Sequence, residues 1–337
     1  MNVLNYVDEV VVIADCEKVH TKNVNLFSRK RDKAGEKNVL DLIEGLKEIF
    51  VNPTLYKSPK EFIRQIHKHK RPLVFPYWHG ENSRNRFALI SSICESYGIP
   101  YVGGDTYSNI VCGDKILSKD ICRQSGLDFP KYEIIRNPKK LNIQKSLNYP
   151  IIIKPIFEGS SIGITQENII QEEKDIRPLA NILYKNLNQP MVIEEFIPGD
   201  EVCIAIIGQG ENIKHWGAIK RIHQTDKSFF EKKVYGFYEK LDEKFSDIDA
   251  SNLISKDTLK KLFDTFKSLD KIEYLRIDGK LFNNTFYCIE LSHDMSLNKN
   301  GAFFNALKYK GLNHKDVIKE LIINCLERHS SQYSSLP

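Results

Sequence analysis

A lysine at the end of an apolar run is followed by a turn rich in glycine and serine, and this is the clearest chemical signal in the chain. Residues 151–153 are three isoleucines, which is typical of a buried strand. Lys154 follows them, and Pro155 keeps the strand from continuing regularly. The segment 158–163 (EGSSIG) supplies flexible backbone N–H groups and two hydroxyls, which can surround a polyphosphate. A cation beside such a loop is the chemistry that holds ATP, although an isolated Gly/Ser turn is more often a plain hairpin.

A second segment, residues 194–201 (EEFIPGDE), places carboxylates and an apolar pair at the end of a predicted strand. The apolar pair could line a slot for adenine, and a carboxylate could bind the ribose hydroxyls. By itself this segment would be interpreted as a strand and a turn. The side chains concerned are Glu194, Glu195, Phe196, Ile197 and Glu201.

A third segment holds Arg276 and Asp278 two positions apart on a predicted strand, so both side chains point to one face. A predicted hairpin can bring Glu290 beside Asp278. Two like charges held close together need a cation between them, and Mg²⁺ takes carboxylates together with phosphate oxygens. The alternative for Arg276 and Asp278 is a surface ion pair, which contributes little stability. Glu290 fits that alternative poorly, because Ile289 and Leu291 flank it.

Strands and helices alternate over the first hundred residues, which predicts a mostly parallel sheet built from βαβ units. The expected strands are residues 10–14, 72–77 and 99–102, and the expected helices are residues 39–49, 59–69 and 85–97. Gly98 is placed to end the third of these helices.

The rest of the chain predicts an antiparallel α+β body that begins near Gly113. The expected strands are 132–136, 149–154, 162–165, 191–195, 201–207 and 215–221, followed by a hairpin of 274–282 and 285–291. The expected helices are 114–125, 177–188, 256–269 and 314–328. Residues 223–249 are polar and aromatic and predict a long loop. Such a loop suits a mobile lid, and a plain surface hairpin is the alternative.

Composition and charge argue against several classes of protein. The net charge of +5 is mild, and the lysines are spread among acidic residues, so there is no basic stripe for a nucleic acid. The seven cysteines are scattered without a CxxC pair, which fits reduced thiols in a cytoplasm. The N-terminus lacks the basic region of a signal peptide, and no apolar run is long enough to cross a membrane. We therefore expect a cytoplasmic protein with small-molecule substrates and neither nucleic-acid nor membrane partners.

Taken in order along the chain, these segments resemble the ATP-grasp superfamily, and most closely its D-alanine–D-alanine ligase branch. Further similar segments are PYWHG (76–80), YGIPYVGGDTYSNIVCGDKILSK (97–119) and GLNHKDVIKELI (311–322). The resemblance implies an ATP-grasp fold, α/β and α+β, with an N-terminal Rossmann-like parallel domain and a two-lobed ATP-binding body. The implied parts are an N-terminal domain (1–113), a central lobe (114–190), a C-terminal lobe with the metal site (191–330) and a frayed tail (331–337). The resemblance also implies a homodimer.

The resemblance implies a role for each matching residue in binding the nucleotide. Lys115 and Lys154 would contact the ATP phosphates. The loop around them would contribute Glu158, Ser160 and Ser161. Residues 194–197 would meet the adenine, and Glu201 would meet the ribose.

The metal and catalytic roles are carried over in the same way. Asp278, Glu290 and, more weakly, Ser292 would bind Mg²⁺, with two ions expected and Mn²⁺ as a possible substitute. Arg276 would stabilise the charge that develops at the acyl centre, with Lys154 and Ser160 also catalytic. His79 would lie near the first substrate.

Several segments depart from the pattern of this branch, and they are the ones that would contact the substrates. The Gly-rich turn near the N-terminus is missing, and the family's metal pair Glu-x-Asn reads Glu290-Leu291-Ser292 here. The lid's Lys-Tyr pair is at best Lys233 and Tyr235. Arg84 and Arg86 follow His79-Gly80 and could clamp a substrate carboxylate, because a guanidinium binds one through two hydrogen bonds; two exposed arginines at a helix start are the alternative.

These observations predict an ATP-dependent carboxylate–amine ligase that joins amino acids or small peptides through an acyl phosphate. A genuine D-alanine–D-alanine or D-alanine–D-lactate ligase is one alternative, against which the rewritten substrate segments count. A nucleotide-binding regulatory protein that has lost catalysis is the other, and it depends on Ser292 and the displaced lid lysine.

Overall fold

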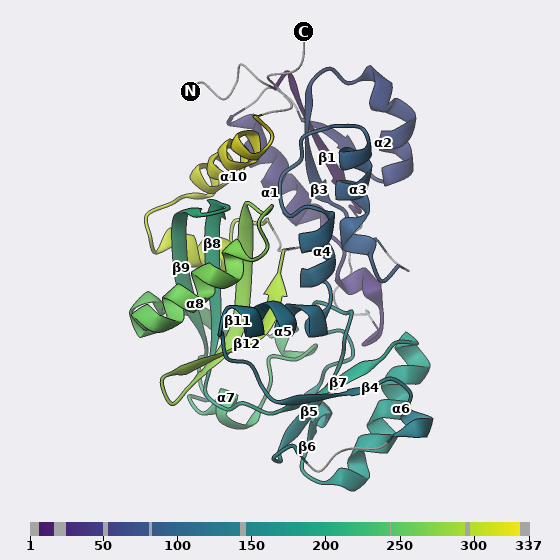
Figure 1. Ribbon diagram of the computed structural model, residues 1–337, viewed down its shortest axis with the longest axis vertical. Coiled ribbons are helices and arrows are strands. Elements are labelled where there is room, and N and C mark those ends of the chain that lie inside the picture. The colour runs from purple at the N-terminus through teal and green to yellow at the C-terminus, as the bar shows by residue number, and fades with distance from the viewer. Residues whose placement is uncertain are drawn as a thin grey trace.

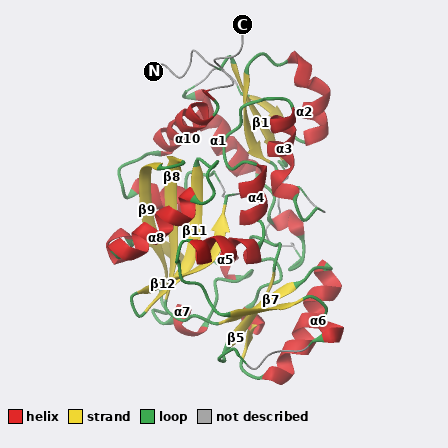
Figure 2. Ribbon diagram, viewed as in Figure 1, coloured by secondary structure: helices red, strands yellow, loops and turns green. Residues whose placement is uncertain are grey.

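The computed structural model describes residues 7–16, 25–49, 53–80, 83–141, 146–242, 244–293 and 297–330. Within them, the chain forms three sheets with helices packed around them (Figures 1 and 2). The predicted frayed tail, residues 331–337, lies outside the described residues. None of the helices in the described ranges combines the length and the apolar character that crossing a bilayer requires.

The first sheet is parallel, as predicted, and has the strand order β2-β1-β3. Its strands are β1 (Glu9–Ala14), β2 (Thr54–Tyr56) and β3 (Pro72–Tyr77), and its helices are α1 (Glu36–Lys47), α2 (Pro59–Gln65) and α3 (Leu89–Ser96). The next helix, α4 (Thr106–Cys112), packs into the core of the third sheet described below. The strand predicted at 99–102 is wrong in extent: only Tyr101 pairs with the sheet, through one bridge to Val74. Ser58 caps α2, accepting a hydrogen bond from the Glu61 N–H as its sequence position predicts.

The second sheet is antiparallel, with the order β4-β7-β5-β6. It contains β4 (Tyr132–Ile135), β5 (Ile151–Pro155), β6 (Ile169–Ile170) and β7 (Met191–Glu195), and it is covered by α6 (Ile176–Leu187). The third sheet has the order β10-β9-β8-β11-β12. It contains β8 (Asp200–Gln209), β9 (Asn212–His223), β10 (Phe245–Asp249), β11 (Tyr274–Phe282) and β12 (Thr285–Ser292).

The helices α5 (Lys115–Gln124) and α8 (Lys256–Lys267) pack on one side of the third sheet, and α9 (Ala302–Lys308) and α10 (His314–Arg328) pack on the other (Figure 1). The side chains of α9 and α10 share one hydrophobic core with β1, β3 and β8, which includes Val10, Leu73, Ala205, Phe303 and Leu321. The second sheet has a separate core with α6. The predicted division at residues 113 and 190 stays a prediction.

Two predicted segments differ from the structure. Residues 162–165 form turns rather than a strand, because Ser160, Ser161 and Gly163 all have positive φ and turn the chain repeatedly. Residues 223–249 are not one long loop: they contain the short helix α7 (Phe229–Lys232), a 3₁₀ turn at Glu239–Leu241 and the edge strand β10. The aromatic side chains of Phe229, Phe230 and Phe245 pack against one another there, which gives the segment a small core of its own.

Candidate active site

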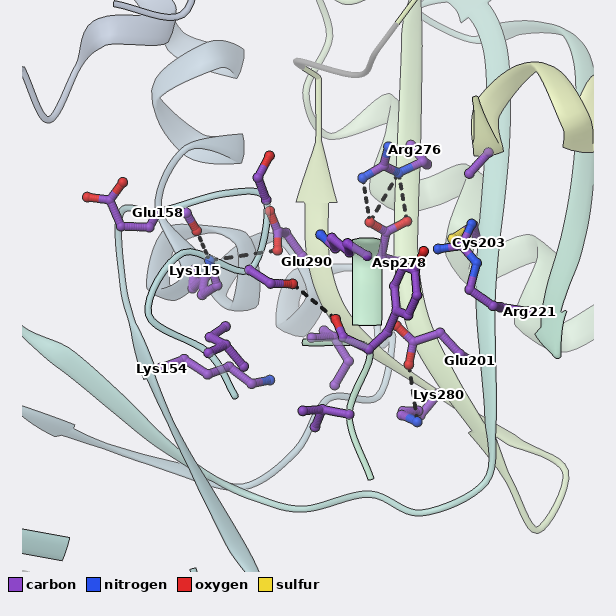
Figure 3. Close-up of a pocket in the computed structure, with 18 of the residues that line it drawn as sticks. Lys115, Lys154, Glu158, Glu201, Cys203, Arg221, Arg276, Asp278, Lys280 and Glu290 are labelled. Carbon is purple, nitrogen blue, oxygen red and sulfur yellow. Dashed lines mark hydrogen bonds and ion pairs between the residues drawn. The ribbon is translucent and has the colours of Figure 1, made fainter. Parts of the chain in front are cut away.

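A cavity of about 650 Å³ lies between the second and third sheets, and residues from both line it (Figure 3). This volume is in the range that holds a nucleotide-sized ligand. Most of the residues predicted for ATP and metal binding line it: Lys115, Lys154, Glu158, Ser160, Ser161, Glu194, Glu195, Phe196, Ile197, Glu201, Arg276, Asp278 and Glu290. Tyr235, predicted to contact substrate, lines it as well. Segments far apart in the sequence therefore meet at one place.

Lys154 lies at the end of β5 and is held by a buried carboxylate on the neighbouring strand. Its Nζ donates to Glu194 Oε2 at 2.7 Å, and Lys119 Nζ approaches the other oxygen of Glu194 at 2.7 Å. The Glu194 side chain is fully buried. Burial alone would raise the pKa of Glu194, but the two lysines outweigh it and hold that pKa at about 2. Glu194 is thus ionised, and it fixes Lys154 at the cavity wall.

Lys115 begins α5 and is the second lysine at the cavity. Its Nζ donates to the backbone carbonyl of Glu158 at 2.6 Å and lies 3.7 Å from Glu290 Oε2. The helix start is set by Asp114, whose side chain accepts hydrogen bonds from the Ile116 and Leu117 N–H groups. Lys115 therefore bridges the glycine-rich loop and the hairpin that carries the acidic pair (Figure 3).

The loop 158–163 presents its serines to the cavity, but the carboxylate of Glu158 is used elsewhere. Ser160 Oγ donates to Asp32 Oδ1 at 2.6 Å, and Ser161 Oγ donates to the Tyr235 carbonyl at 3.0 Å. The buried Glu158 carboxylate accepts from Arg29 at 2.7 Å and from Gln189 at 2.5 Å. The part of Glu158 that faces Lys115 is its carbonyl, while the carboxylate points away (Figure 3).

The other wall of the cavity carries the residues predicted to meet adenine and ribose. Phe196 and Ile197 continue from β7, and Glu195 accepts hydrogen bonds from the backbone and side chain of Asn148. Glu201, on β8, pairs with Lys280 of β11 at 3.1 Å. The wall thus combines apolar surface with the carboxylates of Glu195 and Glu201.

Asp278 on β11 and Glu290 on β12 are directly paired across the hairpin, which confirms that the turn at Asn283-Asn284 brings them together. Arg276 forms an ion pair with Asp278 at 2.7 Å on the same strand face. Ser292 is buried opposite Arg276. Across the described residues, no three Asp, Glu, His or Cys side chains gather as a complete metal cage. Two carboxylates beside a phosphate-sized space nevertheless fit Mg²⁺, which takes one or two carboxylates and completes its shell with phosphate oxygens and water.

A smaller cavity of about 190 Å³ adjoins this one, and its lining includes His79, Arg276 and Ser292. Arg84 and Arg86 line neither cavity. Arg84 pairs with Asp114 at 2.9 Å and lies over the Phe157 ring. Arg86 is buried between Asp32 at 3.0 Å and Glu158 at 3.5 Å, so the alternative of an exposed arginine is wrong for it. Both guanidinium groups are occupied by carboxylates of the protein, and this placement does not support a clamp on a substrate.

His79 lies beside the smaller cavity rather than the larger one. Its ring contacts the Asp32 carbonyl through Nδ1, and its backbone N–H donates to Asp15 Oδ2 at 3.3 Å. Glu81 and Asn82, which follow it, lie outside the described residues. His79 shares that cavity with Arg276, Glu290 and Ser292, and its place near the first substrate stays a prediction.

Sequence reasoning missed four cations at the cavity: Arg31, Arg221, Lys240 and Lys280. Arg221 lies over the Tyr235 ring at 4.4 Å and pairs with Asp247 at 2.9 Å. Burial lowers the pKa of Lys240, which lies in the predicted lid seven positions after Lys233. Strand pairing could have predicted Arg221 and Lys280, since each lies on a strand directly opposite Glu201. Arg31 and Lys240 lie in short 3₁₀ turns and had none.

Comparisons with known proteins agree with this geometry. The family described as "D-ala D-ala ligase C-terminus" matches residues 121–323. A D-alanine–D-alanine ligase of Pelagibacter ubique (strain HTCC1062) is 29% identical over 78% of this chain and 84% of its own length. One of Geobacillus thermodenitrificans (strain NG80-2) is 26% identical over 77% and 71%.

The fold agrees as well. A crystal structure of D-alanine–D-alanine ligase from Bacillus anthracis complexed with ATP superposes with a TM-score of 0.70 at 17% identity, covering 96% of this chain and 99% of that one. The family match covers more than half of the chain and includes β4 to β12, so this chain belongs to the D-alanine–D-alanine ligase family and has the ATP-grasp fold.

Proposed function

We propose that this protein uses ATP to join the carboxylate of one small molecule to the amine of another, with amino acids or short peptides as substrates. Membership of the family makes the chain an ATP-dependent ligase that forms an amide bond. The carboxylate would be activated as an acyl phosphate, which the amine then attacks. One observation carries the proposal: Lys115, Lys154, Asp278 and Glu290 come from four separate segments and line one cavity.

The two lysines and the acidic pair would hold the nucleotide from opposite sides. Lys154, fixed by Glu194, and Lys115, fixed by the Glu158 carbonyl, would place positive charge where the transferred phosphoryl group becomes more negative. Asp278 and Glu290 would bind Mg²⁺, or Mn²⁺ in its place, and Ser292 is a weaker candidate ligand. When bound, the metal supplies charge neutralisation of the phosphates. Residues 194–197 would contact adenine, and Glu201 would contact ribose.

The remaining catalytic groups would act on the acyl centre. Arg276 is placed beside Asp278 and would stabilise the oxyanion that forms when the amine attacks. Ser160, whose hydroxyl donates to Asp32, is the candidate for orienting the incoming substrate. The segment 223–249 would exclude water from the acyl phosphate, because the Tyr235 carbonyl and the Phe237 N–H bond directly to the loop 158–164.

The names of the relatives favour D-alanine as a substrate. The substrate side of the site argues for a different pair, because its Gly-rich turn and its lid pair depart from that branch. We therefore keep D-alanyl–D-alanine (or D-alanyl–D-lactate) synthesis as the second candidate. A regulatory protein without catalysis is the third.

Phosphate release in the presence of ATP, Mg²⁺ and pairs of amino acids, with mass spectrometry of the products, tests the proposal. An amide product that depends on both partners supports it. Turnover with D-alanine alone would make the second candidate correct. ATP hydrolysis without any amide product, or no turnover with any pair, would favour the regulatory protein.

We also infer that the protein lies in a cytoplasm and that it forms a homodimer. The seven cysteines are free thiols, which supports a reducing compartment. Light scattering coupled to size exclusion measures the mass, and a monomer at micromolar concentration would contradict the dimer.

A further inference from the structure

A smaller cavity of about 190 Å³ adjoins the nucleotide cavity and shares Arg31, Ser160, Lys240, Arg276 and Glu290 with it. This volume is below the range of nucleotide sites and suits a small amino acid. Because Arg276 and Glu290 lie between the two cavities, a molecule in the smaller one would meet the phosphates at the acidic hairpin. The smaller cavity is therefore where a substrate carboxylate would be activated.

A short basic segment contributes to the lining of this cavity. Arg31 ends a 3₁₀ turn (Arg29–Arg31), and Lys33 lies just beyond it. Arg31 lies over the Phe237 ring at 4.9 Å, and within the described residues no carboxylate is within ion-pair distance of it. Removal from water lowers the pKa of Arg31, which is the response of a partly buried cation that lacks an anionic neighbour.

The carboxylates near this cavity are already engaged. Asp32 binds Arg86 at 3.0 Å and Ser160 at 2.6 Å. Asp15 accepts from the His79 and Gly80 N–H groups at 3.3 and 3.2 Å. Glu290 faces Lys115 and the proposed metal. These carboxylates are therefore not available to Arg31, which faces the cavity without an acidic partner among the described residues, and this favours an anionic ligand.

From this arrangement, and resting on the function proposed above, we infer that the smaller cavity binds an acidic amino acid, whose side-chain carboxylate is bound by Arg31. A guanidinium binds a carboxylate through two parallel hydrogen bonds, and the Phe237 ring holds the Arg31 plane in place. The main-chain carboxylate would then extend toward Arg276 and the phosphates.

Matched substrates test the charge directly. Glutamate and glutamine, and aspartate and asparagine, differ in little but one ionised group, and each is supplied in both enantiomers with a panel of second amino acids. Because a hydrogen bond to a charged group contributes about 1.5 to 3 kcal/mol, kcat/KM for the acid should exceed that for the amide by about 10- to 150-fold. Equal turnover of acid and amide would overturn the inference and leave the proposed function intact.

Variants of Arg31 test whether its side chain binds the substrate or the nucleotide. In Arg31→Gln the KM for the acidic substrate should rise by about 10- to 100-fold, while the KM for ATP and the rate with the amide stay within about twofold. Lys30→Gln is the matched control, because Lys30 is the exposed neighbour in the same turn. A rise in the KM for ATP instead would assign Arg31 to the phosphates and overturn the inference.

Calorimetry keeps the test independent of turnover. Glutamate and glutamine are titrated into wild type and Arg31→Gln, each with ADP and Mg²⁺ present. Binding of glutamate to wild type alone supports the inference even if no amide is formed, in which case only the proposed function fails. Absence of glutamate and aspartate binding to wild type, or equal binding of glutamate and glutamine, overturns it.

Discussion

The two sides of the active site are built from different kinds of structure. The nucleotide side is built mainly on strands and on the start of α5, and its charged side chains have fixed partners, such as Lys154 with Glu194 or Asp278 with Arg276. The substrate side consists of the 3₁₀ turn at Arg29–Arg31, the loop after β3 and the segment 223–249. The residues proposed to hold the nucleotide thus lie mainly on the scaffold, while those proposed to select a substrate lie mainly on loops, where replacement disturbs packing least.

The largest effect on activity should follow from removing the Lys154 ammonium group on the nucleotide side. Lys154→Ala should lower kcat/KM by about 100-fold or more and weaken ATP binding, because it removes charge stabilisation that strengthens in the transition state. Lys140→Ala, at an exposed position in the same half of the chain, is the control. Unchanged ATP affinity in Lys154→Ala would show that the nucleotide does not bind beside Lys154.

The buried carboxylate behind that lysine should matter more for stability than for chemistry. Glu194→Gln leaves Lys119 and Lys154 without their shared anion and should lower the free energy of unfolding by about 3 to 5 kcal/mol, measured in urea. Glu195→Gln, whose partner is a neutral amide, should cost less than about 1.5 kcal/mol. Equal losses of unfolding free energy in the two variants would show that the anion shared by Lys119 and Lys154 stabilises the fold no more than an ordinary hydrogen-bonded carboxylate does.

The same carboxylate makes a prediction about pH. The pKa of Glu194 is about 2 in the folded protein, below the value of about 4.3 in an unfolded chain. Its stabilisation is therefore fully present above about pH 4.3 and is lost as the pH falls toward 2. Between pH 5 and 7, the difference in unfolding free energy between wild type and Glu194→Gln should be constant at about 3 to 5 kcal/mol. The difference should shrink below about pH 4.

A smaller effect is expected at the acidic hairpin. Asp278→Asn should raise the Mg²⁺ concentration needed for half-maximal activity by about 10-fold, because it removes one of two carboxylate ligands. Asp270→Asn, at an exposed turn where asparagine also accepts positive φ, is the control. An unchanged Mg²⁺ titration would remove Asp278 from the metal site and leave it as the partner of Arg276.

The smallest effect is expected at Arg84. Its side chain is 57% exposed and pairs with Asp114, so Arg84→Ala should change the free energy of unfolding by no more than about 1 kcal/mol. The KM of each substrate should stay within about twofold. A rise of about tenfold or more in the KM of one substrate alone would indicate that Arg84 binds that substrate, and would weaken the contrast between the two sides of the site.

The nucleotide side could be predicted from sequence because its residues lie on regular elements. Lys154 ends an isoleucine run, and Asp278 and Glu290 face one another through a short hairpin, so strand periodicity placed them correctly. The contact of Lys119 with Glu194, behind Lys154, was not predictable from spacing, since it joins a helix to a strand. Arg86 was misinterpreted because its partners Asp32 and Glu158 are distant in the chain and no local pattern indicates burial.

The shared core of the first sheet with α9 and α10 has a consequence for synthesis on the ribosome. Residues such as Val10 and Leu73 emerge well before Phe303 and Leu321, which cover the same core. The second sheet and α6 carry their own core and can fold while translation continues. The first sheet is therefore made early and completed late, and nascent chains should need protection of this sheet until α10 leaves the exit tunnel.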